Sequence, residues 1–270
     1  MRPAGLILES CVREGIDEYR RKSKSPFPGD PSLTLYPTLT GFTASRPGNS
    51  GDPIVLEEKG DELVLHLCRE LLRPAPERAI KGWVHHVLGH YQLSEQRAFS
   101  PFNFSRQILP LFPVTGSAVN LMRQIVERLK NGLEAFLTIR WIATIGLGEE
   151  QVSLFSYRLK ILAEGMETYQ LAIPHPWIRA ACLSGFLQHF LAITCLDGQD
   201  LSSARDLKVQ WWSRHAHLLR EDQALLEEMA LVPLERGSRP FPALLAELFQ
   251  LMRSNLLSGP IDKTCSKTWH

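Results

Sequence analysis

The chain has 270 residues, 44% hydrophobic and 22% charged, which is ordinary for a globular protein of one or two domains. Lysine and arginine total 30 against 29 aspartates and glutamates, so the formal net charge of +1 excludes a protein that is basic or acidic throughout. The five cysteines form no CxxC pair, which argues against a zinc ribbon and indicates reduced thiols in a cytoplasmic protein.

The first residues predict a helix over 3–23 and no targeting segment. Pro3 suits the first turn of a helix, and Glu9 and Arg13 make this stretch too charged for a signal peptide. We find no run of about 18 uncharged apolar residues anywhere in the sequence. We therefore expect no membrane partner.

A stretch rich in proline and glycine, residues 25–57, follows this helix. Its middle, residues 33–42, alternates weakly and could pair as a short strand, but we interpret the whole stretch as a long loop. Such a loop is either ordered for a function or a linker that orders on a partner. Leucines spaced four apart then predict a helix over residues 59–73.

Residues 77–93 predict an amphipathic helix. The same region also permits a second interpretation, a helix-turn-helix. In that interpretation, residues 79–91 are the first helix of a helix-turn-helix and residues 92–94 are its turn. The second helix would then span residues 95–104, although Pro101 allows only a short recognition helix.

The most regular pattern lies within residues 117–169. Apolar residues recur at alternating spacings of three and four in two stretches, residues 119–136 and 152–169. Gly146 and Gly148 lie between them, where a helix can end and the chain can reverse. The pattern predicts a long antiparallel helical hairpin.

Residues 177–196 are apolar on nearly all sides, which is typical of a helix buried at the centre of a bundle. Further helices are predicted after it, over residues 202–219, 221–231 and 241–256.

The elements together predict an all-α protein, a helical bundle with a Pro/Gly-rich N-terminal loop. We divide the chain into an N-terminal helical region, a C-terminal helical bundle and a tail, at residues 1–110, 111–258 and 259–270.

Basic residues gather in and before the first arm of the predicted hairpin. Between residues 97 and 147 the sequence has six basic and two acidic residues, whereas residues 148–200 have three basic and six acidic residues. One interpretation is two solvated helix faces of complementary charge. The other is a strip that contacts the phosphate backbone of DNA or RNA. The candidate contacts are Arg97, Arg106, Arg123, Arg128 and Lys130.

His86 and His90 are the candidate metal ligands. On a helix they would lie four residues apart on one face, a spacing that lets two imidazoles bind one zinc or another divalent metal. The residue after His86 is Val87 rather than a glutamate, so the sequence supplies no adjacent general base. A third ligand would have to come from a carboxylate or from His66, His175, His189, His215 or His217. We therefore expect no cofactor and keep a metal ion as the alternative.

Trp211, Trp212 and Arg214 form the last candidate site. Adjacent tryptophans cannot both face one core, so one of them is expected to be partly exposed. An exposed tryptophan beside an arginine suits a protein interface or stacking on a base. The alternative is that the two rings cover two sides of one packed helix.

The sequence has no Walker A loop, no GxGxxG after a strand and no GxSxG. We therefore predict a non-catalytic intracellular subunit of a larger assembly, and we favour a nucleoprotein complex in which a basic helix face contacts the backbone of DNA or RNA. The expected partners are nucleic acid, other protein subunits or both. The alternatives are a metal-dependent hydrolase built on His86 and His90, and a purely protein-binding helical adaptor.

Overall fold

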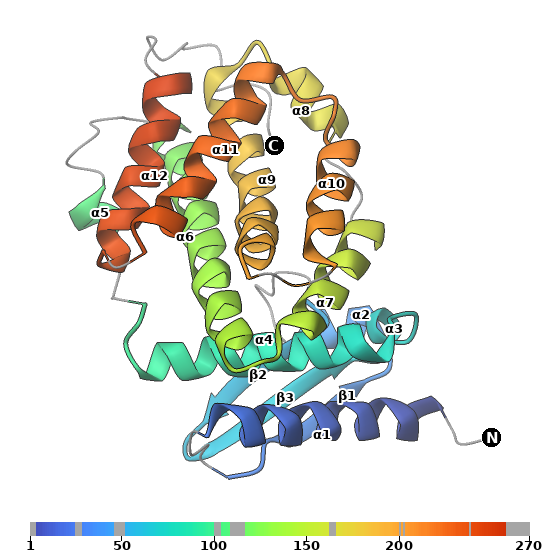
Figure 1. The fold of residues 1–270 in the computed structure, drawn as a ribbon. Helices are drawn as coiled ribbons and strands as arrows, with labels where there is room; N and C mark the ends of the chain where they lie inside the picture. Colours follow the sequence, from blue (N-terminus) through green and yellow to red (C-terminus); the bar gives the residue numbers. More distant parts are fainter. Residues whose placement is uncertain are drawn as a thin grey trace. The chain divides into compact units, whose positions relative to one another are not determined.

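The fold is mainly helical (Figure 1). The computed structural model describes residues 4–24, 29–45, 52–99, 104–108, 117–161, 166–199, 201, 203–237 and 239–257. Helix accounts for 74% and strand for 8% of it. The prediction of a predominantly helical protein is therefore confirmed, and the small sheet corrects the prediction of an all-α fold.

The described residues form two compact units. Those within residues 1–95, 138–161 and 199–207 make up the first unit, and those within 96–137, 162–198 and 208–270 make up the second. This division differs from the predicted boundary after residue 110, because two later segments of the chain return to the first unit. The predicted tail, residues 259–270, lies outside the described residues.

The first unit combines a three-stranded sheet with helices. Its elements are α1 (Ala4–Ser23), β1 (Ser32–Tyr36), α2 (Leu39–Ser45), β2 (Ile54–Lys59), β3 (Glu62–Cys68), α3 (Arg69–Leu72), α4 (Glu77–Glu95) and α7 (Gly148–Ile161), with the end of α6. The strand order is β1-β3-β2, with β1 parallel and β2 antiparallel to β3. The predicted helices over 3–23 and 77–93 are confirmed as α1 and α4.

The predicted helix over residues 59–73 is wrong, because most of it is the central strand β3. Every residue of β3 after Glu62 is buried, so both faces of the strand are covered and the period of two is hidden. Gly60, with a φ of 65°, and Asp61 form the two-residue turn between β2 and β3. Only α3 is helical in this range.

The predicted loop over residues 25–57 is also corrected in part. It contains β1, α2 and the first residues of β2. The weak alternation of apolar and polar residues over 33–42 therefore corresponds to a strand in its first half, where β1 lies. Residues 25–28 and 46–51 lie outside the described part of the chain.

Helix α4 is the centre of the first unit, where it packs against α1, α7 and β2 (Figure 1). Glycine permits the closest of these contacts. A Cβ atom added to Gly82 would lie 2.3 Å from the backbone oxygen of Glu150 on α7, and one added to Gly89 would lie 3.1 Å from Ile142. The missing side chain of Gly82 therefore lets the α4 and α7 backbones approach closely, and that of Gly89 leaves room for the Ile142 side chain.

The predicted helix-turn-helix is wrong in the described residues. Its turn, residues 92–94, is continuous helix within α4, and residues 96–99 after α4 are not helical. Gln92 is buried and accepts a hydrogen bond from the Tyr19 hydroxyl, which holds this last turn of α4 against α1.

The second unit is helical in all its described elements. These are α5 (Phe104–Gln107), the first part of α6 (Ser117–Thr144), α8 (Met166–Ala172), α9 (Pro176–Asp197), most of α10 (Ala204–Arg214), α11 (Arg220–Glu235) and α12 (Phe241–Leu256). Helix α9 contacts α8, α11 and α12, which confirms the prediction of a buried core helix. Of the described helices, only α9 is long and apolar enough to cross a membrane, and 67% of its most apolar 18 residues are buried in the fold.

Of the predicted hairpin, the helix of the first arm and the chain break near Gly146 are present, and the hairpin itself stays a prediction. Helix α6 ends at Thr144, Gly146 takes a φ of 78°, and α7 starts at Gly148. The second arm is shorter than predicted, because α7 ends at Ile161 and α8 is a separate helix. Antiparallel packing of the two arms stays a prediction.

Replacing Gly82 with alanine tests the close contact of α4 and α7. We expect Gly82→Ala to lower the free energy of unfolding by about 3 kcal/mol, because the new methyl group would meet backbone that cannot turn aside. Denaturant unfolding measures the change. The control is Gly185→Ala within α9, where the nearest atom would be 3.6 Å away and alanine favours the helix. Equal stability of the two variants would contradict the close contact.

Candidate functional site

The five candidate phosphate contacts all lie in the second unit. Arg97, Arg106 and Arg123 are exposed. Arg97 follows the end of α4 and has a φ of 58°, so the chain turns sharply at this residue. These three side chains are accessible to a partner.

A non-covalent contact between Phe104 on α5 and Arg123 on α6 links these two helices. The guanidinium carbon of Arg123 on α6 lies over the Phe104 ring, 5.6 Å from its centre, in a cation–π contact. Arg106 is on the same short helix as Phe104. One aromatic contact therefore joins the two short stretches of chain that carry Arg106 and Arg123.

Arg128 and Lys130 have partners inside the second unit. The Arg128 Nη1 group donates a hydrogen bond to the backbone oxygen of Ala181 on α9. The Lys130 ammonium lies 2.7 Å from the carboxylate of Glu134, a residue that is only 7% exposed. Removing either cation would leave a buried acceptor less satisfied, so both residues have a structural role.

His86 and His90 are both on α4, as predicted. His86 is partly buried, and its Nδ1 atom has no hydrogen-bond partner among the described residues. Burial, together with the positive charge of Arg158 and the neighbouring His90, lowers the pKa of His86 to about 3, so its imidazole is neutral. A neutral imidazole is the form that binds metals. However, no three His, Cys, Asp or Glu side chains of the described chain lie close enough to hold one metal ion.

His66, one of the candidate third ligands, is part of the sheet. It is 4% exposed on β3, and its two ring nitrogens have partners on both neighbouring strands. Nδ1 lies 3.0 Å from the Tyr36 hydroxyl on β1, and Nε2 lies 2.9 Å from the Glu57 carboxylate on β2. The imidazole thus links the three strands.

Of the tryptophan pair, Trp211 is a core residue. It is 1% exposed, and its ring stacks on His215 with the ring centres 4.0 Å apart. Trp212 is half-buried and meets the Phe190 ring nearly edge-on at 5.0 Å. Trp212 and the half-buried Arg214 are therefore the members of this group that reach the surface.

A polar chain in the first unit was not expected from the sequence. The Tyr19 hydroxyl on α1 donates to Gln92 on α4, at 2.7 Å, and accepts from the indole nitrogen of Trp141 on α6, at 3.2 Å. Burial raises the pKa of Tyr19 to about 12, so the hydroxyl stays protonated. His85, fully buried on α4, donates from Nε2 to the backbone oxygen of Gly15, at 3.1 Å. These bonds join helices that are far apart in the sequence.

A second unexpected cluster surrounds Asp222 in the second unit. This carboxylate is fully buried on α11 and accepts hydrogen bonds from the Tyr169 hydroxyl on α8 and from Arg179 on α9. Burial and the bond to Asp222 raise the pKa of Tyr169 to about 12. A buried ion pair that is fully hydrogen-bonded fixes how the three helices meet. No run of residues in the sequence reveals it, because its members are 43 and 53 positions from Asp222.

The buried His85 predicts a loss of stability in mild acid. Burial lowers the pKa of His85 to about 4, below the value of about 6.5 in the unfolded chain. The unfolded state therefore binds the proton first, and the stabilising contribution is complete above about pH 6.5 and is lost as the pH falls toward 4.

We expect His85→Gln to reduce the slope of unfolding free energy against pH in this window, by at most about 1.4 kcal/mol per pH unit. Denaturant unfolding at a series of pH values gives the slope, which separates the titration from any change in overall stability. An unchanged slope would show that His85 is protonated equally in both states.

Comparisons with models of protein families, with curated proteins and with solved structures give no match for this chain. The candidate functions therefore rest on the residues themselves. His66, His85 and Asp222 are buried polar residues whose hydrogen bonds join helices or strands. The exposed arginines of the second unit and the half-buried Trp212 remain as surface features.

Proposed function

We propose that the chain is a non-catalytic intracellular subunit of a nucleoprotein assembly, and that Arg97, Arg106 and Arg123 contact a DNA or RNA backbone. The observation that carries the proposal is the contact of Arg123 with Phe104, which brings two exposed cations onto connected elements of one unit. Guanidinium groups are suited to phosphate because they donate in a fixed, forked geometry.

The proposed contact set is smaller than the five residues of the sequence prediction. Arg128 and Lys130 are half-buried, whereas Arg97, Arg106 and Arg123 are exposed, so we assign Arg128 and Lys130 a supporting role. Three phosphate contacts correspond to a slope of about −2.7 in a plot of log affinity against log salt for duplex DNA. Affinity would then fall about 40-fold between about 50 and 200 mM salt.

Charge reversal at Arg123 tests this proposal. We expect Arg123→Glu to weaken binding to a duplex oligonucleotide and to reduce the magnitude of the salt slope by about 1, because one phosphate contact is lost. Fluorescence anisotropy across a salt series measures both quantities. The matched control is Arg13→Glu, which changes the net charge equally at an exposed residue of α1 in the first unit.

Two results would contradict the proposal. The first is no binding of duplex or single-stranded oligonucleotides by the natural chain at low salt. The second is an equal loss of affinity in Arg123→Glu and Arg13→Glu, which would reflect net charge alone. Metal content measured on the same samples tests the alternative of a hydrolase built on His86 and His90, which requires about one bound ion per chain.

A protein-binding adaptor is the second proposal. Trp212 and Arg214 favour it, because a half-buried tryptophan beside a cation is typical of interface hot spots. An adaptor would bind its partner without any affinity for oligonucleotides, and truncation of Trp212 would weaken that binding. The salt series therefore distinguishes the two proposals.

A further inference from the structure

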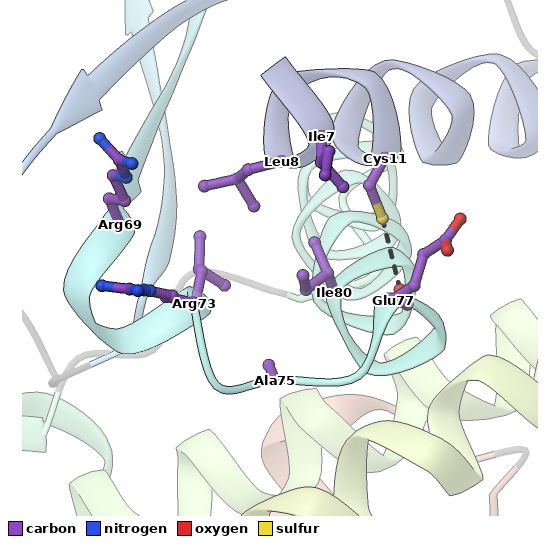
Figure 2. A pocket seen from close by; sticks show the side chains of 9 residues that line it. Ile7, Leu8, Cys11, Arg69, Arg73, Ala75, Glu77 and Ile80 are labelled. Atoms are coloured by element: carbon purple, nitrogen blue, oxygen red, sulfur yellow. Dashed lines mark hydrogen bonds between the residues drawn. The ribbon is translucent and has the colours of Figure 1, made fainter. Parts of the chain in front are cut away.

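A pocket of about 310 Å³ lies in the first unit, between the start of α1, α3 and the start of α4 (Figure 2). It is formed entirely within residues 7–80, so its walls belong to one compact unit. Its volume is at the lower end of the range for ligand sites. The lining residues are Ile7, Leu8, Cys11, Arg69, Leu72, Arg73, Ala75, Glu77 and Ile80.

The walls of the pocket are apolar. Leu8, Leu72 and Ile80 are buried side chains from three different helices. Ile7 is 55% exposed, so apolar surface extends from the pocket toward solvent. A partner that covered Ile7 as well as filling the pocket would remove both apolar surfaces from water.

The Cys11 thiol lines the pocket and is unreactive. Its Sγ atom donates to the backbone oxygen of Glu77, at 3.4 Å, as Figure 2 shows. Burial raises the pKa of Cys11 to about 11, so the thiol is protonated and a poor nucleophile. The pocket is therefore suited to binding and not to covalent chemistry.

The side of the pocket formed by α3 is positively charged. Arg69 and Arg73 both come from this side, opposite Glu77 (Figure 2). Neither guanidinium has an ion-pair partner among the described residues. The Glu77 carboxylate, in contrast, lies 3.7 Å from the Lys81 ammonium. The two arginines are thus the available charges beside an apolar cavity.

We propose that this pocket is a docking site for a partner protein, which inserts a leucine or phenylalanine side chain and places acidic residues against Arg69 and Arg73. The positive charges of Arg69 and Arg73 favour acidic residues in the partner, and the buried apolar walls favour an apolar side chain inside the pocket. The exposed Ile7 favours a peptide segment over a small amphiphile, since a segment continues beyond the anchor and covers neighbouring surface. The site goes beyond the proposed nucleic-acid contact and lies in the other unit.

The test uses the full chain and a capped, fluorescent peptide of sequence Gly-Ser-Leu-Glu-Glu-Ser-Gly. We expect saturable binding that is lost when the leucine is replaced by serine, and that is weakened about fivefold or more when both glutamates become glutamine. Peptide binding measured by anisotropy at constant salt gives these ratios.

Two protein variants locate the site. Arg73→Glu changes an exposed charge on the rim and should weaken the peptide about fivefold, whereas Arg13→Glu on α1 should not. Ala75→Phe, at a half-buried position of the wall, should fill the cavity and abolish binding. Circular dichroism checks that both variants are folded.

Three outcomes would overturn the proposal. One is no saturable binding of the peptide. Another is equal binding of the leucine and serine peptides, which would mean a charge contact without an anchor. The third is saturable binding of decanoate without binding of the peptide, which would identify a small amphiphile as the occupant. None of these outcomes depends on the oligonucleotide measurements.

Discussion

The first unit depends on the close contact between α4 and α7 at Gly82. The backbones approach to a distance that leaves no room for a Cβ atom, so this contact fixes where the two helices lie. The same α4 carries His85 against Gly15 of α1 and Gln92 against Tyr19. Because α4 continues through residues 92–94, the turn that a helix-turn-helix needs there is not formed.

The buried polar clusters around His66 and Asp222 join elements of the fold. His66 links three strands, and Asp222 links α8, α9 and α11 through Tyr169 and Arg179. Each group satisfies the hydrogen-bonding needs of a buried neighbour, which is the requirement that burial imposes on polar atoms. The functional proposals therefore concern the surface, namely Arg97, Arg106 and Arg123 and the pocket beside α3.

Helices could be predicted from the sequence where one face, or every face, was clearly apolar, as in α1, α4 and α9. Strand β3 could not, because leucines spaced four apart in a buried strand imitate a helix; the turn at Gly60 and Asp61 was the available signal. The Lys130–Glu134 pair follows from its spacing along α6. The bond from Arg128 to Ala181 and the pocket around Leu8 could not be predicted, because folding alone brings their parts together.

The central claim is that function resides in the exposed arginines and not in the histidines of α4. Hydrogen exchange of the full chain, with and without a duplex oligonucleotide, tests it most directly. The account predicts slower exchange in α5 and in the turns of α6 around Arg123, with α4 unchanged. Slower exchange confined to the part of α4 that carries His86 and His90 would contradict it.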